Sequence, residues 1–116
     1  MKVRRNEGFT LVELMVVVLI IGVMIAIAVP IFNAAKGSAQ IKTCWANQRE
    51  IEGAVQTYLA HTGAVPSAGT VDSSHILIAG GYIKKAPICP AGHQNYAVDA
   101  SGTVTFACLT CGHTHY

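Results

Sequence analysis

A run of nineteen residues without a charged side chain, LMVVVLIIGVMIAIAVPIF, extends from Leu14 to Phe32. A helix needs about 20 mostly apolar residues to cross the hydrocarbon core of a bilayer. Apolar residues make up 52% of the 116-residue chain and charged residues only 12%, and the apolar excess is concentrated in this run. The run therefore predicts a membrane-spanning helix, and the residues left over suffice for one small domain.

The charges beside this run predict its orientation in the membrane. Lys2, Arg4 and Arg5 outweigh Glu7, so the first eight residues carry the whole formal charge of +2. By the positive-inside rule this end stays in the cytoplasm, and everything after Phe32 lies outside the cytoplasmic membrane. The remaining residues are electrically balanced, which gives no support for a basic nucleic-acid-binding surface.

Glu13 stands at the edge of the apolar run. A carboxylate there is costly in lipid unless it is neutralised or paired, which makes it a candidate functional group. Thr10 and Glu13 also fit the S/T-x-x-E capping box, in which the two side chains satisfy N–H groups at a helix start. A secretory signal peptide cut at Ala26-Ile27-Ala28 and a plain signal anchor are alternatives, but neither accounts for Glu13.

The segment from Lys2 to Leu14, KVRRNEGFTLVEL, resembles the prepilin signal of the type IV pilin-like family: a basic leader that ends in Gly, then Phe-Thr-Leu-Val-Glu-Leu and an apolar helix. The resemblance implies that residues 1–8 are a leader, which a prepilin peptidase removes between Gly8 and Phe9. It also implies methylation of the new amino group of Phe9 and retention of the apolar helix, residues 9–32.

In that family, the glutamate that corresponds to Glu13 pairs with the cationic N-terminus of a neighbouring subunit, here Phe9. Two ions that are each costly in an apolar bundle neutralise one another when they meet. The resemblance thus implies a homo-oligomeric helical filament. Pro30 and Gly22 interrupt the helical pattern, and we expect a kink or local melting near them in the filament.

Residues 33–116 are expected to form a small globular head. Its first part, 33–62, carries apolar or semi-apolar residues at steps of three and four, which predicts an amphipathic helix that Gly63 ends. The stripe consists of Ile41, Cys44, Trp45, Gln48, Ile51, Val55, Tyr58 and Leu59. A loop over 63–74 follows, and Ser73 or Ser74 is expected to cap a short helix over 75–79.

The last third of the chain predicts a β-hairpin. Tyr96 and Val98 stand at alternate positions before Asp99-Ala100-Ser101-Gly102, and Val104, Phe106 and Cys108 stand at alternate positions after it, with Gly102 expected to supply a positive φ at the turn. The fold class is therefore α+β, a long helix packed on a small antiparallel sheet. The preceding YIKKAPICPAGHQNY resembles a Cys-Pro-x-Gly-Gly-x-Tyr turn of some pilins, but His93 replaces the second glycine and one extra residue precedes Tyr96.

Four cysteines in an exported chain indicate disulfides. Three complete pairings are possible. We favour Cys89 with Cys108, which ties the entry of the hairpin to its exit, and Cys44 with Cys111, which fastens the tail to the helix. Each bond would contribute about 2–4 kcal/mol to stability.

Zinc is the alternative for the same residues. Cys108-Leu109-Thr110-Cys111 has the spacing of a zinc knuckle, although the chain has no second Cys-x-x-Cys. The site could be completed by Cys89, His93, His113 and His115. Covalent haem is excluded because Gly112 stands where the histidine should follow the second cysteine.

These features favour a structural subunit of a pilus-like filament, with neither enzymatic activity nor a cofactor. Nucleophile, base and orienting group do not form a recognisable motif. Its expected partners are its own copies, the membrane, the prepilin peptidase and the assembly machinery, and its destination is a cell-surface filament or a periplasmic pseudopilus. The rival hypothesis is an exported, membrane-tethered zinc-binding or redox module, which would not depend on Glu13.

Overall fold

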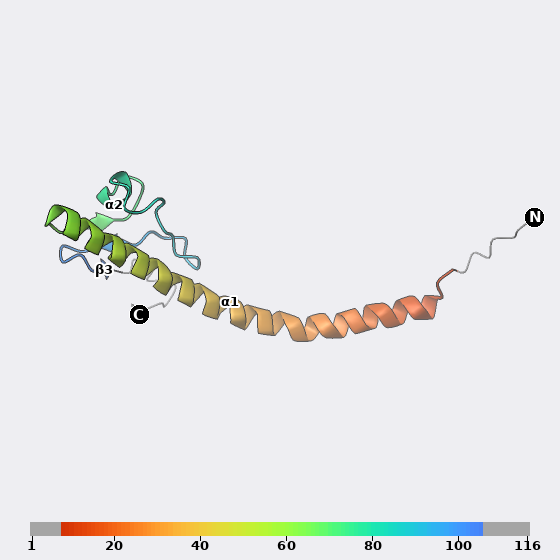
Figure 1. Ribbon diagram of the computed structural model, residues 1–116. Helices are drawn as coiled ribbons and strands as arrows, with labels where there is room; N and C mark the ends of the chain where they lie inside the picture. Colours follow the sequence, from red (N-terminus) through yellow and green to blue (C-terminus); the bar gives the residue numbers. More distant parts are fainter. Residues whose placement is uncertain (1–7, 106–116) are drawn as a thin grey trace, which may run out of the picture. The chain divides into compact units, whose positions relative to one another are not determined.

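The computed structural model describes residues 8–105 (Figure 1). Its elements are helix α1 (Leu11–Thr62), strand β1 (Gly69–Thr70), helix α2 (Ile76–Ala79), strand β2 (Ala97–Val98) and strand β3 (Val104–Thr105). The chain divides into two compact units, with the boundary between Lys36 and Gly37.

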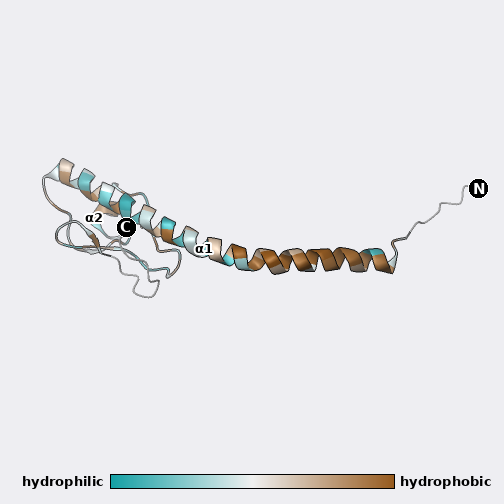
Figure 2. Ribbon diagram, turned by 90° about the horizontal axis from the view of Figure 1, so that it is seen from below, coloured by the Kyte–Doolittle hydropathy of each residue, from teal (hydrophilic) through white to brown (hydrophobic). Residues whose placement is uncertain are grey.

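The first unit contains the apolar part of α1. Figure 2 shows that apolar residues surround the helix here, whereas polar residues mark the later turns. The helix continues through Gly22, and Pro30 lies inside it. The kink expected near these two residues concerns the assembled filament and stays a prediction.

In the second unit, α1 buries one stripe of side chains. Cys44, Gln48, Ile51 and Val55 are spaced by three or four residues and are all buried, which confirms the predicted amphipathic stripe. The helix ends at Thr62, where Gly63 adopts a φ of 74° and donates its N–H to the carbonyl of Leu59 at 2.8 Å. The predicted glycine stop is therefore confirmed.

The strands form an antiparallel sheet in the order β1-β2-β3. Val98 faces Val104 in the predicted hairpin, and Gly69 of β1 pairs with Val98 on the other side. The α+β class and the hairpin are confirmed, whereas Phe106 and Cys108 lie outside the described residues. Strand β1 was not expected, because two exposed residues inside a turn-rich segment carry no alternation.

One apolar core joins the buried stripe of α1 to the sheet, to α2 and to the segment before β2. Its members are Cys44, Ile51, Ala54, Val55, Val71, Leu77, Ile83, Cys89, Tyr96, Val98 and Val104. Tyr58 packs on this core. Its ring meets the ring of Tyr82 in an edge-to-face arrangement, with the ring centroids 5.3 Å apart. A head of this size has a small core, so each of these contacts matters.

Helix α2 is capped by His75, and the expectation of a serine cap was wrong. The ring Nδ1 of His75 accepts the N–H of Leu77 at 3.3 Å, while Nε2 lies 3.0 Å from the carbonyl of Ser67. Ser74 instead donates its N–H and its hydroxyl to Asp72. The buried imidazole of His75 thus caps α2 in place of the usual hydroxyl. Its second ring nitrogen also contacts the 63–74 loop, so one side chain serves both elements.

The turn after Pro90 places His93 in the left-handed region, with a φ of 50°. The N–H of His93 donates to the carbonyl of Cys89 at 2.8 Å, and the N–H of Cys89 donates to the carbonyl of Gln94 at 2.9 Å. Glycine is favoured at such a φ, although histidine is among the residues that tolerate it. The chain therefore keeps a glycine-like conformation at the position where His93 departs from the pilin pattern.

The β2–β3 turn is built around Asp99. Its Oδ1 accepts the N–H of Ser101 at 2.8 Å, the hydroxyl of Ser101 at 2.6 Å and the N–H of Thr103 at 2.9 Å. Gly102 follows with a φ of 83°, as the hairpin pattern predicted. The Ser101 hydroxyl is the main cause that holds the pKa of the Asp99 carboxyl below its usual range, and the N–H of Thr103 adds to it.

Replacing Gly102 by alanine should destabilise the head. An added Cβ would lie 2.9 Å from Cγ1 of Val55 and 3.1 Å from Cγ1 of Val65. The left-handed backbone alone costs a non-glycine residue about 1–2 kcal/mol, and overpacking adds about 1–3 kcal/mol. Thermal unfolding of the full chain in detergent should show a clearly lower midpoint.

Gly53→Ala is the matched control for this substitution. Gly53 lies in α1, and a Cβ added there would meet nothing within 4 Å, so alanine should raise stability by up to about 1 kcal/mol. Equal midpoints for Gly102→Ala and the unmodified chain would contradict the turn geometry.

The stability of the head should also fall in acid. The Asp99 pKa is lowered on folding, so its contribution is complete above the ordinary aspartate pKa of about 4 and is lost as the pH falls through the lower folded value. Asp99→Asn keeps an acceptor oxygen but removes the titration. The variant should lose less stability than the unmodified chain between about pH 5 and pH 2, and identical pH profiles would refute this role of Asp99.

Candidate functional site

The start of α1 is held by a reciprocal capping box. Glu13 Oε2 accepts both the backbone N–H and the hydroxyl of Thr10, each at 2.8 Å, while Thr10 Oγ1 accepts the N–H of Glu13 at 3.2 Å. This confirms the capping hypothesis for the isolated chain. Both bonds from Thr10 end on the same carboxylate oxygen, so the cap does not require the second oxygen of Glu13.

The residues predicted to flank the processing site are open to solvent. The Phe9 side chain is 92% exposed, and no other group comes within 4 Å of the position a Gly8 side chain would take. Phe9 precedes Glu13 by only four residues. The structure therefore presents the candidate cleavage site, the candidate methylated residue and the carboxylate at the same end of α1.

Between this end and Lys36, α1 carries no charged residue other than Glu13. The large apolar side chains from Leu11 to Phe32 are 48–73% exposed, which leaves apolar surface on every side of the helix. The helix is long and apolar enough to cross a membrane. Surface of this extent is not stable in water, because each Å² costs about 25 cal/mol, so it must be covered by lipid or by other helices.

Two shallow hollows interrupt this apolar surface. One contains the predicted kink residue Gly22, and its lining is Met15, Val18, Leu19, Gly22, Val23 and Ala26. The other is lined by Met24, Ile27, Ala28, Ile31, Phe32 and Ala35. Hollows between side-chain ridges are the features into which the side chains of a neighbouring helix insert. They suit helix packing better than the binding of a polar ligand.

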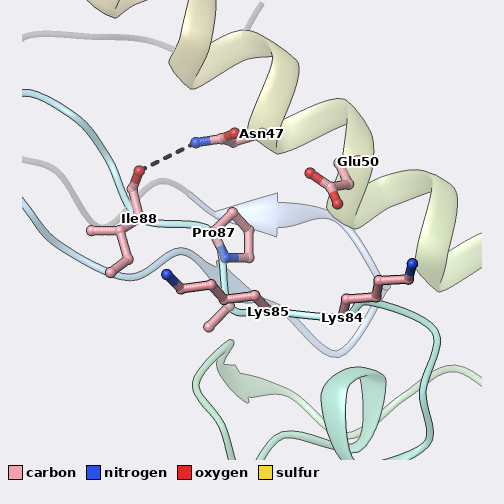
Figure 3. A pocket seen from close by; sticks show the side chains of 7 residues that line it. Asn47, Glu50, Lys84, Lys85, Pro87 and Ile88 are labelled. Carbon is pink, nitrogen blue, oxygen red and sulfur yellow. Dashed lines mark hydrogen bonds between the residues drawn. The ribbon is translucent and has the colours of Figure 1, made fainter.

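The head has a groove of about 430 Å³ between α1 and the segment before Cys89 (Figure 3). Asn47 and Glu50 reach it from α1, opposite Lys84 and Lys85. Its other lining residues are Ala86, Pro87 and Ile88, so the lining includes no serine, cysteine or histidine. The groove has charged groups but no hydroxyl, thiol or imidazole side chain, and its residues form no recognisable catalytic motif.

Asn47 is a structural residue that the sequence did not single out. Its Nδ2 donates to the carbonyl of Ile88 at 3.2 Å and lies 3.3 Å from the Tyr96 hydroxyl. Burial raises the pKa of Tyr96, which keeps its hydroxyl protonated. Asn47 thus joins α1 to the segment before β2, and no local sequence pattern announces such a long-range bond.

The structure brings Cys44 and Cys89 together. Both are buried, and their Sγ atoms lie 3.3 Å apart. Burial raises the pKa of the Cys44 thiol above its ordinary value. Cys108 and Cys111 lie outside the described residues, so the predicted Cys89–Cys108 and Cys44–Cys111 bonds stay predictions.

The candidate ligands of the alternative zinc site likewise lie partly outside the described residues. Cys89 and His93 are described, whereas Cys108 and Cys111 are not. Within residues 8–105, no group of three or more His, Cys, Asp or Glu side chains is arranged to hold a metal ion. The zinc hypothesis therefore receives no added support from the described part of the chain.

Comparison with known proteins relates most of the chain to a competence protein, a secretion-system protein and pilins. Residues 3–29 match the family described as the prokaryotic N-terminal methylation motif. Competence protein ComGC of Bacillus subtilis is 32% identical over 77% of this chain and 86% of its own length. Type II secretion system core protein G of Pseudomonas aeruginosa is 31% identical over 89% of this chain and 80% of its own length.

The chain also resembles larger pilins. Type IV major pilin protein PilE of Neisseria gonorrhoeae is 34% identical over 72% of this chain, which spans 51% of PilE. No solved structure matches. Because two relatives above 30% identity are matched over most of their length, and because the capped apolar helix and the α+β head agree with them, the chain belongs to the type IV pilin-like family.

Proposed function

We propose that the chain is made as a membrane-anchored precursor, is cut between Gly8 and Phe9, and then polymerises through its apolar helix. Family membership makes it a structural subunit of a pilus-like filament. The observation that carries the proposal is the uncovered apolar surface from Leu11 to Phe32 at the end of α1 that also bears Glu13.

The processing step is supported by the N-terminal motif and its exposure. The methylation motif covers residues 3–29, and Gly8 and Phe9 are open to solvent. A prepilin peptidase on the cytoplasmic side would remove the basic leader, and methylation of the Phe9 amino group would follow. The cations of the leader hold this end in the cytoplasm, which leaves the head outside the membrane.

Assembly would exchange the lipid around the apolar helix for the helices of neighbouring subunits. Glu13 then enters an apolar bundle, where an unpaired carboxylate costs several kcal/mol. The amino group of Phe9 on a neighbouring subunit neutralises it, and the capping box keeps the carboxylate in a defined position while one oxygen accepts the amine. Only the axial stagger that brings the two charges together is stable, so this pair sets the register of the filament.

The head is proposed to have no enzymatic activity. The relatives include a secretion-system core protein and a major pilin, and the lining of the groove beside Asn47 and Glu50 has no hydroxyl, thiol or imidazole. The head contributes the exposed surface of the filament, which is either a cell-surface filament or a periplasmic pseudopilus. Association with the machinery that extrudes such filaments follows from this role.

Glu13→Gln separates the charge of Glu13 from its role as a cap. Glutamine also serves at this position of a capping box, so the helix start should survive. If the carboxylate pairs with the amine of a neighbour, the variant leaves that amine buried without its partner, at a cost of about 3–5 kcal/mol. The amount of filament sheared from cells should then fall by at least about tenfold.

Glu50→Gln is the matched control, since it makes the same change on an exposed position of the same helix within the head. Immunoblots of membranes should show equal amounts of precursor for the unmodified chain and for both variants. Normal filament yield from Glu13→Gln would contradict the proposed pairing. Such a result would favour a role for Glu13 in capping the helix alone.

A further inference from the structure

We infer that Cys44 and Cys89 form a disulfide bond that fastens the segment before β2 to α1. The two sulfur atoms lie 3.3 Å apart, and both residues are buried in the core of the head. This pairing differs from the Cys89–Cys108 and Cys44–Cys111 bonds favoured by the sequence. It assigns a covalent modification site that does not depend on the C-terminal tail.

Hydrogen bonds on both sides of Cys89 hold it in register with the helix. Gln40 Nε2 donates to the carbonyl of Pro90 at 3.4 Å, and Asn47 Nδ2 donates to the carbonyl of Ile88 at 3.2 Å. Gln40 and Asn47 lie four residues before and three residues after Cys44, so all three share one face of α1. Pro90, Cys89 and Ile88 thus contact successive turns on the same face of α1. The two sulfur atoms lie between the two hydrogen bonds.

The backbone around Cys89 is fixed independently of its side chain. Its N–H and its carbonyl are both used in the turn that contains His93, and Ile88 and Asn95 form a bridge beside it. A disulfide has an S–S distance of about 2.05 Å, so the sulfur atoms need to approach by roughly 1.3 Å. Rotation of the two side chains about their Cα–Cβ bonds is the movement that would bring the sulfur atoms together.

The reaction converts two thiols to one disulfide and releases two protons and two electrons. The disulfide of an extracytoplasmic thiol oxidoreductase accepts both electrons and both protons and becomes a dithiol. The step therefore rests on the proposed export of the head. Burial raises the pKa of the Cys44 thiol, so the reactive thiolate is scarce once the head has folded. The bond should form while the head folds and should then be shielded from reductants.

The bond would act on the head and not on filament assembly. It closes a loop from residue 44 to residue 89, which restricts the unfolded chain and raises the stability of a domain with a small core. A subunit in a filament under load would keep its head folded against α1. Cys108 and Cys111 would be left to pair with each other or to remain thiols.

Disulfide mapping on protein from membranes or sheared filaments tests the inference directly. Thiols are first alkylated in acid, and the unreduced protein is then cut with trypsin and Asp-N. Trypsin alone leaves Cys89, Cys108 and Cys111 on one fragment, because no lysine or arginine follows Lys85. Asp-N cleavage before Asp99 separates 86–98, with Cys89, from 99–116, with the other two.

The expected product is 43–49, which contains Cys44, linked to 86–98. A link from 43–49 to 99–116, four alkylated thiols, or four thiols that become alkylated only after a chelator removes a metal would each overturn the inference. Failure of Glu13→Gln to affect filaments leaves this result unchanged, so the bond and the proposed assembly are tested separately.

Serine substitutions provide a second measurement. If the bond exists, Cys44→Ser, Cys89→Ser and the double variant should lower the melting temperature equally, by roughly 10 °C or more, because each removes the same bond. Cys108→Ser is the matched control and should leave the 43–49 to 86–98 link intact. Additive losses from the two single variants would indicate two separate buried thiols and would overturn the inference.

Discussion

The structure depends on one uncovered helix. From Leu11 to Phe32 apolar side chains surround α1, and no described part of the chain covers them. Such a surface is compatible with lipid or with a bundle of similar helices, but not with water. Glu13 is the exception within this surface, and its cost in an apolar bundle makes the position of its counter-charge decisive. In the assembly that we propose, the anchor, the filament core and the register between subunits all come from this segment.

The head uses the second half of the same helix differently. There the apolar residues narrow to a stripe that includes Cys44, Ile51 and Val55, and the sheet and α2 pack on it. Because the core is small, polar contacts have a larger share in fixing the fold. Asn47 joins α1 to the segment before β2, and Asp99 organises the hairpin turn. The cysteine pair that we infer would add a covalent link at the place where the helix and the segment already meet.

Local patterns predicted most of this architecture. The Thr10–Glu13 cap, the Gly63 stop and the Gly102 turn each depend on residues close in sequence, so spacing alone indicated them. The contacts that spacing missed join distant residues. The pairing of β1 with β2 depends on tertiary packing, and so does the proximity of Cys44 to Cys89. The cap of α2 by an imidazole was missed for a similar reason, since the ring also has to reach a loop eight residues earlier.

The intact mass of the subunit in purified filaments tests the central claim most directly, because it shows whether the apolar helix is kept after export. The account predicts a polypeptide that begins at Phe9, carries one methyl group on its amino terminus and retains Glu13. A mature chain that begins after Ala28, without the apolar helix, would contradict the account, because no surface would remain through which the copies could assemble.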